Sequence, residues 1–166
     1  MSVSGVRKMF ELAASMHNPI DLSLGQPDFP APFVIKEAAR EAILQDHNRY
    51  APTTGLPALK KRIVRKLQEE NNIATTENQV IITNAASGAL SIMLTVILNE
   101  GDEVLLPDPY FVSYQQLVIQ NGGIPVYVRT RDDFSLDLAA IEQKITPKTR
   151  ALMINSPNNP TGKVYE

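Results

Sequence analysis

The sequence has no cysteine, only two histidines and no long hydrophobic run. Without cysteine the chain can form neither disulfide bonds nor thiolate metal sites, and His17 and His47 are its only imidazole groups. No apolar segment approaches the length of a membrane span, and the start of the chain lacks the charged region and hydrophobic core of a signal peptide. We therefore expect no metal site and no membrane contact, and a cytoplasmic location is compatible with this composition.

The chain also lacks a large excess of charge of either sign. Its formal net charge is −2, its isoelectric point is about 5.7, and its lysines and arginines are scattered along the sequence. This distribution argues against a nucleic-acid surface or an anchor on an anionic membrane, so small molecules or other proteins are the expected partners. With 166 residues, 43% of them apolar, the chain is long enough for one domain with a sizeable core.

Local patterns predict helices that alternate with short apolar strands. We expect helices at about residues 6–15, 33–45, 57–70, 87–98, 111–120 and 138–145, the last behind Asp137 as its cap, and strands at about residues 80–83, 103–106, 125–129 and 151–155. This alternation indicates an α/β fold of three layers, with a mainly parallel sheet covered by helices on both faces. Ligands of such sheets bind beyond the carboxyl ends of the strands.

The most informative segment is residues 155–162, with the sequence Asn-Ser-Pro-Asn-Asn-Pro-Thr-Gly, directly after the last predicted strand. Its prolines fix the backbone and remove donors, its glycine permits conformations closed to other residues, and its Asn amides can both donate and accept hydrogen bonds. The composition predicts a loop that binds a polar ligand. An Asn- and Pro-rich surface turn has the same composition, so the loop needs support from the rest of the chain.

Two further segments follow predicted strands at the same edge of the sheet. Residues 83–90 carry small side chains into a helix, where unpaired backbone N–H groups favour a phosphate, although they match neither a dinucleotide fingerprint nor a Walker loop. Residues 107–114 place aromatic rings where a planar ligand could stack. Each segment alone is also explained by ordinary packing, but the joint occurrence of all three is much more specific.

Together these segments resemble the amino-terminal part of class I/II aminotransferases, which are pyridoxal-phosphate enzymes of fold type I. The similar segments are residues 24–29 (Leu-Gly-Gln-Pro-Asp-Phe), 49–52 (Arg-Tyr-Ala-Pro), 55–56 (Gly-Leu), 101–104 (Gly-Asp-Glu-Val), 109–111 (Pro-Tyr-Phe) and 158–162 (Asn-Asn-Pro-Thr-Gly). The resemblance implies a homodimer that transfers an amino group between an amino acid and a 2-oxo acid. It also implies that residues 1–45 form an amino-terminal segment and part of a small domain, and that residues 46–166 begin the large cofactor-binding domain.

The resemblance assigns four residues to the cofactor within one subunit. Asn159 matches the Asn that hydrogen-bonds the ring oxygen of pyridoxal phosphate, and Phe111 matches the aromatic residue that stacks on the pyridine ring. Ala86 and Ser87 match the pair that holds the phosphate through a backbone N–H and a hydroxyl. Glycines are common at the positions of Ala85 and Ala86 in the family.

Two more residues are assigned by the same resemblance. Tyr50 matches the tyrosine that reaches the phosphate of the neighbouring subunit's cofactor, and Gly25 matches the glycine whose backbone approaches the substrate carboxylate. Their structural alternatives are an ordinary partly buried tyrosine and a glycine that only turns the chain.

The resemblance assigns no catalytic residue to this chain. These enzymes place a Schiff-base lysine, an acidic partner for the pyridine nitrogen and a substrate-binding arginine in a later segment, and none has a matching position before Glu166. We therefore expect that residues 1–166 alone cannot transaminate and that they expose apolar faces. A fragment, a proteolysed product and a naturally short relative are all compatible with this sequence. A pyridoxal-phosphate lyase and a non-catalytic scaffold are the alternative functions.

Overall fold

A computed structural model of the chain describes Met9, residues 12–13, 15–17, Ile20, Gly25 and residues 27–165. The chain divides into two compact units, Met1–Tyr50 and Ala51–Glu166, which are considered separately below. The helix predicted at residues 6–15 falls largely outside the described residues. The predicted domain boundary between residues 45 and 46 stays a prediction.

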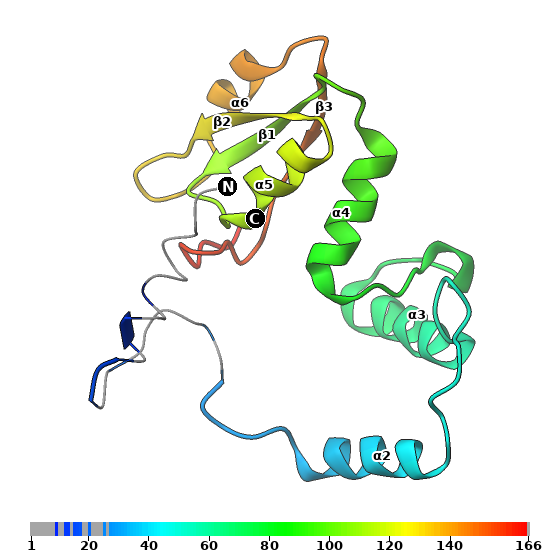
Figure 1. Cartoon of the computed structure of the whole chain (residues 1–166). Helices are drawn as coiled ribbons and strands as arrows, with labels where there is room; N and C mark the ends of the chain where they lie inside the picture. The colour runs from blue at the N-terminus through cyan, green and yellow to red at the C-terminus, as the bar shows by residue number, and fades with distance from the viewer. Residues whose placement is uncertain are drawn as a thin grey trace. The chain divides into compact units, whose positions relative to one another are not determined.

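Helix α2 is the main element described in the first unit (Figure 1). It spans Phe33–Leu44, close to the predicted residues 33–45, and Arg40 donates to Glu37 one turn earlier at 2.8 Å. Such pairs at i and i+3 support a helix locally. The apolar residues Ile35 and Ile43 are nevertheless exposed, so the apolar face of α2 is not buried within this unit.

The second unit begins with two helical segments. Helix α3 spans Pro57–Asn71 and starts with proline at its first position, where no backbone donor is needed. The short 3-10 helix η1 spans Glu77–Gln79 and packs against α3. Thr76 and Gln79 form a capping box at its start, in which the Thr76 backbone N–H donates to Gln79 Oε1 at 3.0 Å.

A parallel three-stranded sheet follows, in the order β2-β1-β3 (Figure 1). The elements are α4 (Ala85–Ile97), β1 (Glu103–Asp108), α5 (Ser113–Gln120), β2 (Ile124–Arg129), α6 (Leu138–Lys144) and β3 (Thr149–Leu152). Asp137 caps α6 as predicted, since its carboxylate accepts a hydrogen bond from the Ala140 backbone N–H at 3.1 Å. The predicted α/β fold with a parallel sheet is therefore confirmed.

Strand β1 lies at the centre of the sheet and contributes to a core on each face. Val104 and Leu106 pack on one face with Leu94 of α4, Val118 of α5 and Leu98, the residue that follows α4. Leu105, which lies between Val104 and Leu106 in the strand, packs on the opposite face in a second cluster with Val128 and Ile141. Because side chains of a strand alternate between faces, this continuous apolar run places helices on both sides of the sheet and produces the predicted three layers.

The predicted strand at residues 80–83 is wrong. The structure assigns no strand there, and the Ile82 backbone N–H donates instead to the Thr54 carbonyl at 3.0 Å. A strand requires a neighbour with which to pair, and no described segment pairs with this run. Four smaller corrections concern boundaries. Helix α4 begins at Ala85 instead of residue 87, and α5 begins at Ser113 instead of residue 111. Strand β1 ends at Asp108 instead of residue 106, and β3 covers Thr149–Leu152 instead of residues 151–155.

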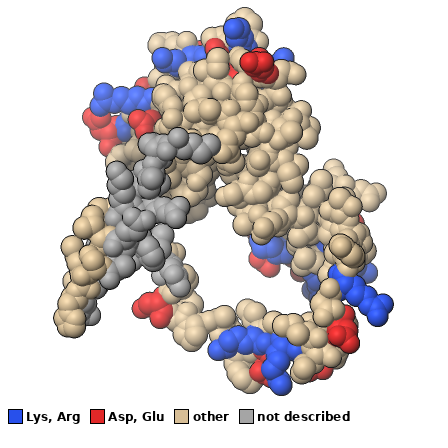
Figure 2. All heavy atoms as spheres, in the orientation of Figure 1, with Lys and Arg blue, Asp and Glu red and all other residues tan. Residues whose placement is uncertain are grey.

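Helix α4 exposes a broad apolar surface. It contains no charged residue, and Ile92, Met93 and Val96 are exposed, with 79% of Val96 accessible. Figure 2 shows that charged side chains of both signs lie elsewhere on the viewed face. Exposed apolar area of this kind is typical of a surface that another segment or chain covers. No described helix has both the length and the hydrophobicity that crossing a bilayer requires.

A carboxylate joins the amino ends of β1 and β3. Asp102 accepts hydrogen bonds from the Asn99 backbone N–H at 2.8 Å and from Arg150 Nε at 3.2 Å. These contacts, the Asn99 backbone bond above all, hold the pKa of Asp102 below its ordinary value. Asp102 therefore links segments that are distant in sequence.

We expect acid to weaken this link. A carboxyl whose pKa is lowered on folding stabilises the folded state above its unfolded pKa, and this contribution is lost as the pH falls toward the folded pKa. The urea midpoint should drop between about pH 5 and about pH 3, and it should drop less in Asp102→Asn than in the wild type. Asp132→Asn, at a fully exposed side chain, is the control and should retain the wild-type acid sensitivity. Equal acid sensitivity in Asp102→Asn and the control would contradict this role.

Candidate functional site

The Asn-rich loop follows β3 and is closed by its own hydrogen bonds. Asn155 Oδ1 accepts from the Asn159 backbone N–H at 2.9 Å, and the Gly162 N–H donates to the Asn158 carbonyl at 2.7 Å. The Ser156 hydroxyl oxygen accepts from the Tyr165 N–H at 3.0 Å. Polar side chains thus satisfy backbone groups that would be paired in a regular strand, and the loop has a defined shape.

The two adjacent asparagines of this loop have different environments. Asn158 is buried, and its Nδ2 donates to the Pro109 carbonyl at 3.1 Å and to Thr161 Oγ1 at 2.9 Å. Asn159 is exposed, and its side-chain amide makes no hydrogen bond to any described residue. The predicted residue Asn159 therefore has an amide available for a ligand, whereas Asn158 connects two loops.

The second loop carries Phe111 after the end of β1. The Phe111 ring is half-buried and meets the Tyr114 ring edge-on, with centroids 5.6 Å apart and an interplanar angle of 78°. Preceding it, Tyr110 stacks on Tyr127 of β2 at 5.6 Å and donates its hydroxyl to Gln115 Oε1 at 2.9 Å. Burial, with smaller effects from Tyr127 and Asp108, raises the pKa of Tyr110 to about 12. Tyr110 is therefore a neutral hydrogen-bond donor at physiological pH. Tyr110 and Tyr114 hold the chain on either side of Phe111.

Ala86 and Ser87 lie in the first turn of α4 and are exposed. The first backbone N–H groups of a helix have no partner within the helix. Asn84, the residue at the cap position, provides no side-chain acceptor for them. This helix end can therefore donate hydrogen bonds to an anion, and α4 shares the core cluster of β1 and α5.

Ala85 adopts an unusual backbone conformation at the start of α4. Its φ is +61°, in the left-handed region, where a side chain costs about 1–2 kcal/mol. Glycine at this position would remove the steric cost. The positive φ of Ala85 and the glycine that is common at this position in the resembled family both indicate a backbone conformation that favours glycine.

Ala85→Gly is expected to raise the free energy of unfolding by about 0.5–1 kcal/mol, because it relieves this conformation. The adjacent Ala86→Gly is the matched control. It should lower the free energy of unfolding by about 0.5–1 kcal/mol, since glycine weakens a helix at an ordinary helical position. Urea denaturation measures both changes, and a loss of stability in both variants would refute the prediction.

Tyr50 and Gly25 lie in the first unit and not in the unit that carries the other predicted residues. Tyr50 is fully exposed. Gly25 is exposed as well, and a side chain built there would meet no atom within 4 Å. Within the second unit, the structure joins the loops of Asn159 and Phe111 and places Ala86 and Ser87 on a helix of the same core. The roles of all six residues stay predictions.

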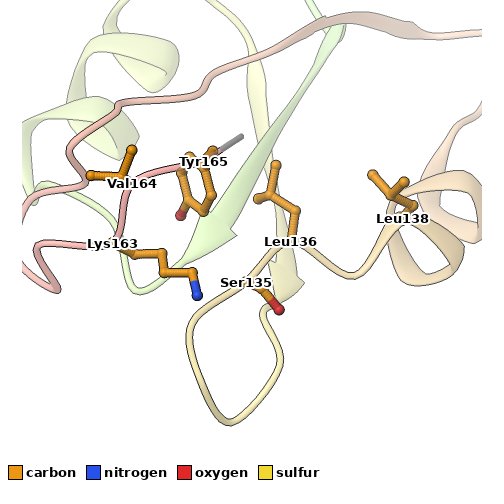
Figure 3. Close-up of a pocket in the computed structure, with 6 residues that line it drawn as sticks. All are labelled: Ser135, Leu136, Leu138, Lys163, Val164 and Tyr165. Carbon is orange, nitrogen blue, oxygen red and sulfur yellow. The ribbon is translucent and has the colours of Figure 1, made fainter.

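A pocket of about 400 Å³ lies beside the Asn-rich loop. Figure 3 shows its lining residues Ser135, Leu136, Leu138, Lys163, Val164 and Tyr165, with Lys163 extending toward the segment of Ser135. Lys163 Nζ pairs with Asp133 at 3.0 Å. Hydrogen bonds from Ser135 and from Lys163 hold the pKa of Asp133 well below its usual range.

Two of these contacts were not predicted from the sequence. From the sequence, Lys163 is expected to be a solvated lysine. In the structure it pairs with Asp133, which lies 30 positions away in the connection between β2 and α6. Asn158 reads like its neighbour Asn159, and only its partner at Pro109 distinguishes the two. No local pattern in the sequence indicates either contact.

Comparison with known proteins identifies the family. The profile of the family Aminotransferase class I and II matches residues 17–166. The chain is 42% identical over 160 residues to aspartate aminotransferase of Geobacillus stearothermophilus, covering 95% of this chain and 41% of that protein. It is 41% identical over 161 residues to the probable aspartate/prephenate aminotransferase of Aquifex aeolicus, with coverage of 96% and 41%. The chain belongs to the class I and II aminotransferase family.

The solved structures agree with this assignment. Aspartate aminotransferase from Thermus thermophilus with maleate superposes with a TM-score of 0.93 at 39% identity, covering 100% of this chain and 45% of that one. The described fold is therefore part of a larger aminotransferase fold. The chain spans less than half the length of these relatives, which carry different substrate names at nearly equal identity.

Proposed function

We propose that the complete protein is a pyridoxal-phosphate-dependent aminotransferase, to which this chain supplies much of the cofactor site. It would transfer an amino group between an amino acid and a 2-oxo acid in a ping-pong reaction. Membership of the family Aminotransferase class I and II supports the aminotransferase activity, and the resemblance of the site motifs to that family supports pyridoxal phosphate as the cofactor. When bound, pyridoxal phosphate supplies an electron sink for the negative charge that develops at the substrate α-carbon.

The observation that carries this proposal is the hydrogen bond between the two loops at the carboxyl edge of the sheet. Asn158 Nδ2 donates to the Pro109 carbonyl at 3.1 Å, which joins the loop of Asn159 to the loop of Phe111. An available amide and a half-buried aromatic ring are thereby held in neighbouring loops. This pair fits a planar ligand with a polar ring substituent.

Each predicted cofactor-binding residue of the second unit has a defined role in this proposal. Asn159 donates a hydrogen bond to the ring oxygen of the cofactor and so favours its ionised form. Phe111 offers its face to the pyridine ring, and Tyr114 limits its rotation through the edge-on contact. The Ala86 N–H and the Ser87 hydroxyl hold the phosphate, which fits the uncapped first turn of α4.

Two residues of the first unit would contribute to the active site, one in the neighbouring subunit and one at the substrate. Tyr50 would reach the phosphate held by the neighbouring subunit, which requires a homodimer and fits a fully exposed tyrosine. Gly25 would bring its backbone to the substrate carboxylate, which fits the open space around it. The cytoplasmic location stays a prediction.

The proposed function is tested with the protein expressed from its complete reading frame. L-aspartate is the first donor to test, since the relatives named above are aspartate or aspartate/prephenate aminotransferases. Addition of L-aspartate without an acceptor should yield the pyridoxamine form of the cofactor and one equivalent of 2-oxo acid per site. The lyase alternative is tested separately with L-serine, whose β-hydroxyl can leave as water. Release of ammonia and pyruvate from L-serine, without formation of the pyridoxamine form from L-aspartate, would contradict transamination and favour the lyase alternative.

We expect residues 1–166 alone to show no steady transamination, because no lysine of this chain matches the Schiff-base position of the family. The measurement is 2-oxo acid formation with the purified chain and added pyridoxal phosphate. Steady turnover would refute this expectation. Oligomerisation without any activity of the complete protein would favour the non-catalytic scaffold.

A further inference from the structure

Asn158 is one of few buried polar residues in the described part of the chain, and all its donors are used. It is 8% exposed, and its two amide hydrogens go to the Pro109 carbonyl and to Thr161 Oγ1. Its backbone N–H donates to the Lys163 carbonyl at 2.8 Å, and its own carbonyl accepts from Gly162. A buried amide with this many partners has a single orientation, since any rotation leaves buried polar groups unpaired.

The bond to Pro109 is the only hydrogen bond between residues 155–165 and residues 107–114 among the described residues. It reaches across 49 positions of sequence and ends two residues before Phe111. The bond to Thr161, in contrast, stays within the Asn-rich loop. One side chain therefore fixes the shape of its own loop and ties that loop to the one that carries the aromatic ring.

We propose that Asn158 is a positioning residue that sets the Asn159 amide relative to the Phe111 ring, a role that rests on the proposed function. Asn159 is its direct neighbour in sequence, so a rotation of Asn158 would move the amide that meets the ligand. An exposed loop held only by its own bonds would allow this movement. The tether to Pro109 restricts it before any ligand arrives, which lowers the ordering cost of binding.

Two variants separate the tether from the internal bond. Asn158→Asp keeps the size of the side chain but replaces a donor by an acceptor, so it cannot bond to the Pro109 carbonyl. Thr161→Val, the matched control, removes the partner inside the loop and leaves the bond to Pro109. Both are made in the 166-residue chain, and backbone hydrogen–deuterium exchange is measured without any cofactor.

Asn158→Asp should raise exchange about fivefold to tenfold in both segments, residues 107–114 and residues 155–165. Thr161→Val should raise it only in residues 155–165. Unchanged exchange of residues 107–114 in Asn158→Asp would overturn the tether. This result does not depend on the proposed function.

The cofactor role is tested with pyridoxamine 5′-phosphate, which binds without a Schiff-base lysine. Affinities are measured in the cofactor-free protein expressed from its complete reading frame, for the wild type, Asn158→Asp, Asn159→Ala and the double variant. If Asn158 acts only through Asn159, Asn158→Asp should lower the affinity about fivefold to tenfold in the wild-type background. It should cause no further loss of affinity when it is combined with Asn159→Ala. Additive losses would overturn positioning through Asn159, because a purely structural effect is independent of that amide.

Failure of the proposed function gives a different result. If the complete wild-type protein does not bind pyridoxamine 5′-phosphate, the proposed function fails and the cofactor roles of Asn158 and Asn159 are overturned with it, whatever the exchange data show. If it binds and exchange in residues 107–114 does not respond, the proposed function stands and the tether is overturned.

Discussion

Asn159→Ala is expected to weaken the binding of pyridoxamine 5′-phosphate about 10- to 100-fold. A hydrogen bond to a charged group contributes about 1.5–3 kcal/mol, and each 1.4 kcal/mol is a factor of about ten in affinity. The Asn159 side chain makes no hydrogen bond to the described residues, so the substitution removes an interaction with the ligand and breaks no hydrogen bond among those residues. A fluorescence titration of the ligand at neutral pH measures the change.

A matched asparagine controls for the loss of an exposed amide. Asn78 is exposed in η1 and is not one of the predicted site residues, so Asn78→Ala should leave the affinity unchanged. Thermal unfolding of both variants checks that the fold persists. Wild-type affinity in Asn159→Ala, or an equal loss in Asn78→Ala, would show that Asn159 does not bind the ligand.

Leu106→Ala is expected to lower the free energy of unfolding by about 2–5 kcal/mol. Leu106 is fully buried at the centre of β1 and packs with Val104, Leu94 and Val118. Removal of its side-chain carbons forfeits their transfer from water and leaves a cavity between the sheet and the helices. The loss is a large part of the total stability of a small domain, so the urea midpoint should fall clearly.

Leu138→Ala is the same substitution at an exposed site. Leu138 is 69% exposed at the start of α6, and its replacement should change the free energy of unfolding by less than about 0.5 kcal/mol. The difference between the two variants isolates burial from the chemical change. Similar losses in both would mean that the core does not lie between β1, α4 and α5.

The sequence predicted the helices better than the sheet. Helices α2, α3 and α6 begin and end within one residue of their predicted positions, since their periodicity and their start signals, such as Pro57 and Asp137, lie within the segment itself. A strand is completed only by its neighbour. Residues 80–83 have the apolar pattern of a strand, but the described chain offers no partner, and Ile81 is left 60% exposed.

The candidate site shows the same division. The Asn- and Pro-rich composition of residues 155–162 was sufficient to predict a loop after the last strand, and the small residues of 83–90 were sufficient to predict the start of a helix. The different roles of Asn158 and Asn159 were not predictable, because two adjacent residues of the same type differ only in what the fold places beside them. The left-handed backbone of Ala85 does not follow from alanine itself, which rarely adopts it, and only the glycine common at this position in the family pointed to it.

The sequence by itself determined the α/β class, the parallel alternation of helices and strands, the family and the absence of cysteine chemistry. These properties follow from composition, periodicity and motif order, which are local along the chain. The tertiary structure alone decided that Asn158 bonds to Pro109, that Lys163 pairs with Asp133, and that residues 80–83 form no strand. Each depends on contacts between segments far apart in sequence, and only the folded chain brings such segments together.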